Sequence, residues 1–127
     1  MLARYRIVRG ARPADDPLPE GIRQDTRKHT QHVLRPAPAL VEALLVDASE
    51  ASFQTFRRGY LQLLRQRFAL EPERFDALAE LARTHDVYIG CNCPSARQPH
   101  VERCHTTLAL GFFRDRYPDL PIRIPKS

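Results

Sequence analysis

Residues 87 to 93 read Val87-Tyr88-Ile89-Gly90-Cys91-Asn92-Cys93, a short apolar run that leads directly into two cysteines. A run of this kind, bounded by polar residues, predicts a buried β-strand. A helix is expected after it, from about Cys104 to Tyr117, because Pro118 stops it. Leu120–Ile124 is expected to be a last strand, which Pro121 and Pro125 restrict to the sheet edge. This order predicts a small α/β domain with a short, partly parallel sheet flanked by helices.

Three helices are predicted on the N-terminal side of this run. The first spans Pro38–Val46 and the second runs from about Ser49 to Phe68, with Asp47 and Glu50 forming a variant of the capping box. The third opens at Glu71-Pro72-Glu73, since proline suits an early helical position and acids suit the helix dipole. The second helix carries apolar and aromatic side chains at helical spacing, Phe53, Phe56, Tyr60, Leu63 and Leu64. Side chains at this spacing form a stripe along one helix face, which indicates packing into the core rather than a surface for stacking on bases.

The N-terminal third has less pattern. Tyr5-Arg6-Ile7-Val8-Arg9 alternates enough to predict a first strand, which Gly10 and Pro13 end. A polar, basic loop is expected at about 11–35, with a short strand around Gln31–Leu34 as an option. This loop holds several basic and imidazole side chains, Arg23, Arg27, Lys28, His29 and His32. They are either a solvated surface or contacts for nucleic-acid phosphates.

Length and composition limit the class of protein. The 127 residues suffice for one domain, 1–127, and the net charge of +5 suggests either an anionic partner or a solvated basic surface. No apolar run is long enough for a signal peptide or a membrane span. The three cysteines cluster in one short segment, which favours a reducing compartment and a thiol or metal site. We therefore expect a cytoplasmic protein; the sequence leaves its oligomeric state open.

The candidate site lies where the buried strand ends. Ligands of open α/β sheets gather outside the carboxyl ends of the strands, near the start of the next helix. Cys91 and Cys93 follow the strand, and Cys104-His105 begins the helix. The residues between them, Pro94–Arg103, have no apolar pattern and are expected to form a surface loop.

The first interpretation is a pocket for an anionic ligand, either a nucleotide-like small molecule or one derived from nucleic acid. Free N–H groups at a helix start bind phosphate or carboxylate, and Arg97 and Arg103 would clamp it. Thr106 would add a hydroxyl donor. Together with Cys91, Cys93, Cys104 and His105, these residues form the predicted ligand-binding set.

The second interpretation is a structural zinc site within an interaction module. Cys91, Cys93, Cys104 and either His105 or His100 supply four ligands, enough for tetrahedral coordination. The single residue between Cys91 and Cys93 makes an unusually tight chelate. Zinc is the one cofactor that the residues suggest, and small cysteines that merely pack remain the alternative.

The third interpretation is a cysteine-dependent enzyme with Cys104 as nucleophile, since a helix start lowers the pKa of a thiol. Adjacent residues on a helix point roughly 100° apart, so His105 is expected to be a poor base for Cys104. His100, His29 or His32 would then have to serve. Whether the protein is an enzyme stays open at this point.

The pattern Val87–Pro94 followed by Cys104-His105-Thr106-Thr107 resembles the YeaO-like proteins, a loose group of uncharacterised bacterial and phage domains. There an apolar strand runs into a cysteine-containing turn, and a Cys-His pair starts the next helix. The resemblance covers about the last two-thirds of the chain, but Thr106 stands where those proteins usually have arginine, and the 94–103 loop is long. It implies a compact α/β domain with a rim site at Cys91, Cys93, Cys104 and His105, and no established activity.

Overall fold

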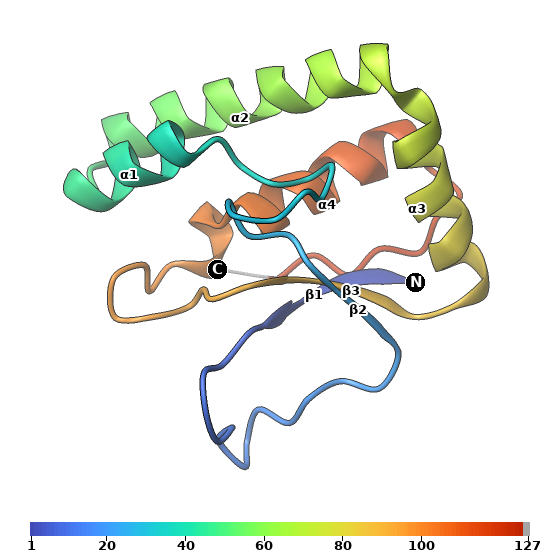
Figure 1. Ribbon diagram of the computed structural model, residues 1–127, viewed down its shortest axis with the longest axis horizontal. Helices are drawn as coiled ribbons and strands as arrows, with labels where there is room; N and C mark the ends of the chain where they lie inside the picture. The colour runs from blue at the N-terminus through green and yellow to red at the C-terminus, as the bar shows by residue number, and fades with distance from the viewer. Residues whose placement is uncertain (126–127) are drawn as a thin grey trace.

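Among residues 1–125, three parallel strands form a small sheet, and the carboxyl ends of the strands meet at one edge of it (Figure 1). The computed structural model of the protein describes residues 1–125. β3 (Val87–Cys91) lies in the centre, between β1 (Leu2–Arg6) and β2 (Ile22–Asp25). The register places Arg6 beside Cys91 and Asp25 beside Gly90. The cysteines that follow β3 therefore emerge between the ends of both edge strands.

In the described part of the chain, four α-helices lie on one side of this sheet, and the segment 7–21 extends on the other (Figure 1). They are α1 (Pro38–Val46), α2 (Glu50–Leu70), α3 (Pro72–Thr84) and α4 (His105–Arg116), with a short 3₁₀ helix, η1 (Val101–Arg103), before α4. The small α/β fold predicted from the sequence is confirmed. The sheet within residues 1–125 is parallel throughout rather than in part.

The apolar stripe of α2 packs into the core, as its spacing predicts. Phe53, Phe56, Tyr60 and Leu64 are buried, and Tyr60 has no exposed surface. The Tyr60 hydroxyl donates a hydrogen bond of 2.7 Å to the carbonyl of Leu34. A ring enclosed in this way cannot stack on a base from solution, so the stripe serves the core.

The first strand begins earlier than the prediction Tyr5–Arg9. β1 spans Leu2–Arg6 because its partner, β3, ends at Cys91, and the register pairs Leu2 with Val87. Leu2 and Ala3 are buried against the core. The alternation of residues 5–9 therefore placed the strand too late, because the strand residues that pack into the core are Leu2 and Ala3.

The predicted loop at about 11–35 contains a strand that its composition conceals. β2 (Ile22–Asp25) pairs with β3, whereas no strand forms at Gln31–Leu34. An edge strand needs apolar side chains only where it meets the core, and here Ile22 is the one that packs there. Backbone pairing with β3 therefore decides the position of β2, and the hydrophobic pattern of 22–25 does not reveal it.

Two smaller expectations also change. The N-cap of α2 is Ser49, whose hydroxyl accepts from the Ser52 amide at 3.1 Å, and Asp47 instead accepts from the Ser49 amide. Leu120–Ile124 is not a strand; it makes a single parallel bridge, between Leu2 and Ile122. Proline lacks the N–H that a longer ladder would need on either side of this bridge.

His32 lies between β2 and α3 with both ring nitrogens engaged. Its Nδ1 accepts from the Leu34 amide at 3.1 Å, and its Nε2 lies 2.7 Å from Gln24 Oε1. Burial lowers the pKa of His32 from 6.5 to about 4. The nearby positive charges act in the same direction as burial, and Asp25 opposes them; these charges belong to Arg74, His105 and Arg35.

We expect the folded state to lose stability through His32 as the pH falls from 6.5 towards 4. The unfolded chain binds a proton on this histidine below pH 6.5, whereas the folded chain does so only near pH 4. The loss amounts to about 2 kcal/mol between pH 6.5 and 5. In urea unfolding at both pH values, His32→Asn should lose correspondingly less stability, and His29→Asn, at an exposed position, should behave as the wild type. Equal losses in His32→Asn and the wild type would contradict the assignment.

Candidate metal centre and its cavity

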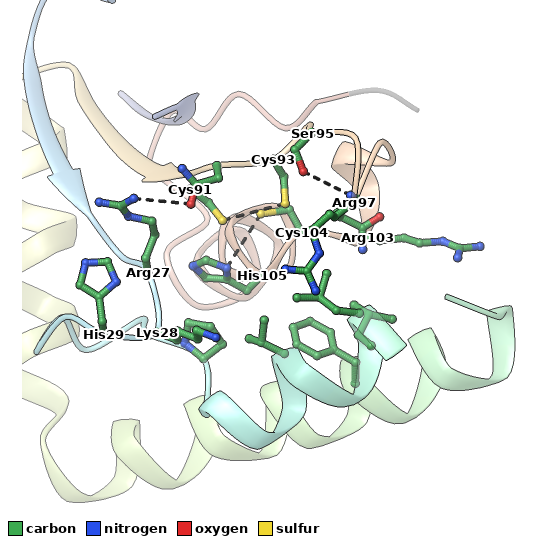
Figure 2. A pocket seen from close by; sticks show the side chains of 17 residues that line it. Arg27, Lys28, His29, Cys91, Cys93, Ser95, Arg97, Arg103, Cys104 and His105 are labelled. Atoms are coloured by element: carbon green, nitrogen blue, oxygen red, sulfur yellow. Dashed lines mark hydrogen bonds between the residues drawn. The ribbon is translucent and has the colours of Figure 1, made fainter. Parts of the chain in front are cut away.

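The three cysteines come together in one cluster, as the sequence predicts. The sulfur atoms of Cys91, Cys93 and Cys104 all lie within 4.8 Å of one another, and those of Cys91 and Cys93 are 4.0 Å apart. Cys91 ends β3, Cys93 follows it, and Cys104 is the N-cap of α4 (Figure 2). Since zinc–sulfur bonds of about 2.3 Å place tetrahedral sulfur ligands about 3.8 Å apart, small shifts would suffice for metal coordination. Three cysteines at these distances can hold a metal ion.

His105 turns its Nδ1 atom towards this cluster. Nδ1 lies 3.9 Å from Cys104 Sγ, closer than the roughly 100° separation of helical neighbours suggests. The expectation that the two side chains diverge is wrong because Cys104 is not helical. As the N-cap it has an extended backbone, with φ −74° and ψ 145°.

Thr26, directly after β2, determines which nitrogen of His105 carries the proton. The Thr26 hydroxyl donates to the Gly90 carbonyl at 2.9 Å, so towards His105 it can only accept. Both this hydroxyl and the Thr26 carbonyl lie within 3.0 Å of His105 Nε2. Nε2 is therefore the N–H donor, and in the neutral ring the lone pair of Nδ1 faces the thiols. Metal-binding histidines have the same arrangement, with the second nitrogen donating to a protein oxygen.

The pKa values of the cluster move in opposite directions. Burial alone would raise the pKa of Cys104, but hydrogen bonds from Cys91, Cys93 and His105 hold it well below its ordinary range. Burial likewise acts to lower the pKa of His105, whereas hydrogen bonds and negative charge from Cys104 and Cys91 raise it to about 9. Hydrogen bonds with Cys104 and Cys91 raise the pKa of Cys93. The site thus stabilises a thiolate on Cys104 beside an imidazolium.

Arg4 and Thr106 support the cluster from the side of β1. Arg4 Nε donates to Thr106 Oγ1 at 2.8 Å, and its Nη2 donates to the Cys93 carbonyl. Thr106 in turn donates to Cys104 Sγ at 3.1 Å. Thr106 is completely buried, so its hydroxyl serves Cys104 rather than the ligand position that the sequence analysis gave it.

A cavity of about 300 Å³ opens beside the thiols, between the 94–103 loop and α1. Figure 2 shows Ser95, Arg97 and Arg103 on one side of it and Arg27, Lys28 and His29 on the other, with the cysteines and His105 between them. Its apolar wall comes from the chain before α1 and from helices α1 and α2: Pro36, Val41, Leu44, Leu45 and Phe56. The segment after β2 therefore lies beside the cysteine cluster and forms part of the cavity lining.

The other predicted site residues separate into two groups. Arg97 and Arg103 line the cavity, and Arg103 Nη2 is bound to Glu50 at 2.9 Å. His100 is exposed and pairs with Glu102, with Nδ1 3.4 Å from the carboxylate, so it is not part of the cluster. Of the two histidines considered as the fourth ligand, only His105 contacts a cysteine sulfur.

Arg4, Thr26 and the apolar wall were not predicted from the sequence. Arg4 lies in an ordinary-looking N-terminal strand, and Thr26 in a segment expected to be an irregular loop. Neither has a local signal, because each reaches the site only through strand pairing. The wall residues Val41, Leu44 and Leu45 belong to the helix predicted at Pro38–Val46, but a helix prediction does not indicate what the apolar face of that helix covers.

Comparison with known proteins adds no identity. No family model, curated protein or solved structure was found to match the chain. The resemblance to the YeaO-like proteins therefore stays a prediction. Within residues 1–125, no helix combines the length and the apolar character that crossing a membrane requires.

Proposed function

We propose that this protein binds zinc through the Cys91, Cys93 and Cys104 thiolates, with His105 Nδ1 as the fourth ligand. The observation that supports this most directly is the convergence of three sulfur atoms within 4.8 Å from two separate chain segments. Thiolate and imidazole are ligands that zinc prefers, and this set suits a tetrahedral ion.

The surroundings of His105 and Cys104 support the same proposal. Thr26 holds one proton on Nε2, so that Nδ1 is the nitrogen that would lose its proton and bind an ion, and Thr106 donates to the Cys104 sulfur. Such outer contacts orient the direct ligands of a metal site. The ion would join the end of β3 to the start of α4 and thereby hold the 94–103 loop beside the cavity.

Exposure favours a ligand role for Cys104 over a nucleophilic one. Only 2% of Cys104 is exposed, so its sulfur offers little surface to a substrate. An ion enclosed by the cluster needs no such access. The cysteine-dependent enzyme is therefore the weaker alternative.

The test is the metal content of untagged protein purified without chelators, followed by titration of the metal-free protein with Co²⁺. We expect about one zinc per chain, and a tetrahedral Co²⁺ spectrum with strong sulfur charge-transfer bands. His105→Ala should weaken Co²⁺ binding or change its spectrum, whereas His100→Ala, the matched control, should leave both unchanged. Absence of metal together with no sulfur-to-cobalt bands would refute the proposal.

A further inference from the structure

We infer that the cavity beside the thiol cluster is a binding site for a small organic anion with an apolar body. This goes beyond the metal site, because it concerns the space between the 94–103 loop and α1 and does not require the ion. The volume of about 300 Å³ is at the lower end of the range for small-molecule pockets.

The sign of the ligand's charge follows from the charged side chains that line the cavity. Four cationic side chains line it, Arg27, Lys28, Arg97 and Arg103, and within residues 1–125 no aspartate or glutamate does. Outside the cysteine–histidine cluster the charges that line the cavity are therefore all positive, and a concave surface of this kind concentrates anionic ligands. A cationic ligand would meet no carboxylate there.

The number of anionic groups on the ligand follows from how many of these four cations already have a partner within the protein. Arg27 is bound to Asp25 at 2.8 Å, Lys28 to Glu42 at 2.5 Å and Arg103 to Glu50 at 2.9 Å. Arg97 has no ion pair or hydrogen bond among the described residues, although its charge acts on Glu42 from a distance. One available guanidinium suits a single carboxylate, sulfonate or phosphate. It suits less well the repeated phosphates of a nucleoside triphosphate or a nucleic-acid strand.

The body of the ligand follows from the opposite wall. Val41, Leu44, Leu45 and Phe56 present hydrocarbon to the cavity, and no charged side chain of α2 lines it. Burying apolar ligand surface against such a wall is favourable in proportion to its area. The ligand is therefore a ring system or short chain that carries one acid group, held with that group at Arg97.

The experiment compares two fluorescent probes that differ in one group, on the protein as purified. The first, 8-anilinonaphthalene-1-sulfonate, is an apolar body with one anionic group, and the second, N-phenyl-1-naphthylamine, is the same body without it. We expect the sulfonate to bind about tenfold or more tightly than the neutral probe, as one charged hydrogen bond predicts. Arg97→Ala should remove this difference by weakening only the sulfonate.

Two further variants locate the binding. Val41→Trp should weaken both probes by filling the cavity, with folding checked by the melting temperature. Arg57→Ala, an exposed arginine of α2 outside the cavity, should change neither. Equal affinity for both probes, or binding that Arg97→Ala and Val41→Trp leave intact, would overturn the inference. Because Co²⁺ spectra report on the metal site separately, failure of one proposal is distinguishable from failure of the other.

Discussion

Replacing Cys104 with serine should weaken metal binding at least about 100-fold, since even the loss of an outer contact to a metal ligand costs about 10–100-fold. Cys104 is the residue on which the cluster converges: Thr106 donates to its sulfur, and His105 Nδ1 lies 3.9 Å away. A serine hydroxyl is a far poorer zinc ligand than a thiolate. The measurement is competitive titration of the metal-free protein with Co²⁺ and then Zn²⁺.

The same substitution separates metal binding from folding. Cys104 is the N-cap of α4 without a side-chain capping bond, and serine is among the preferred N-cap residues. Cys104→Ser should therefore match or exceed the metal-free wild type in stability. Removing the metal with a chelator should lower the melting temperature of the wild type and leave that of Cys104→Ser unchanged. A variant that still binds one zinc with wild-type affinity would contradict the ligand assignment.

Replacing Phe75 with alanine should lower the free energy of unfolding by about 3–5 kcal/mol. Phe75 is completely buried in α3 and joins the aromatic side chains of α2 and α4. Its ring centroid lies 5.3 Å from that of Phe68, 5.7 Å from that of Phe112 and 5.9 Å from that of Phe113. Four aromatic rings in contact leave a large cavity when one is removed, because rigid neighbours collapse little.

Chemical unfolding at pH 7 measures this effect, with Glu73→Ala as the control. Glu73 is an exposed acid in the first turn of the same helix, so its loss should cost less than about 1 kcal/mol. Phe75 does not line the cavity beside the thiol cluster, so the folded fraction of Phe75→Ala should keep the wild-type Co²⁺ spectrum. A loss below 1 kcal/mol for Phe75→Ala would mean that the aromatic cluster contributes little to stability.

Elements with a strong local pattern were predictable from the chain. The helix predicted at Pro38–Val46 is α1 with its observed bounds, and Pro72 with its neighbouring acids marked the start of α3. The apolar run from Val87 predicted β3 to within one residue. In each of these segments the signal is carried by the residues of the segment itself, so no knowledge of its partner is needed.

The position of the candidate site was also predictable, because it depends on chain order. Cysteines that directly follow a central strand, and a Cys-His pair that starts the next helix, must reach the same edge of a parallel sheet. The convergence of Cys91, Cys93 and Cys104 follows from this geometry.

What only the tertiary structure decided is how that site is completed. β2 has a polar sequence, and pairing with β3 alone places Thr26 beside His105 and Arg27 at the cavity. Arg4 reaches the cysteines across the sheet, and the extended backbone at Cys104 turns its sulfur towards the neighbouring imidazole. Local periodicity indicates which side chains are buried. Contacts between residues far apart in the chain depend instead on strand register and helix packing. The sequence by itself therefore located the cysteine cluster, whereas only the folded chain showed that His105 rather than His100 lies beside it and that a cavity adjoins it.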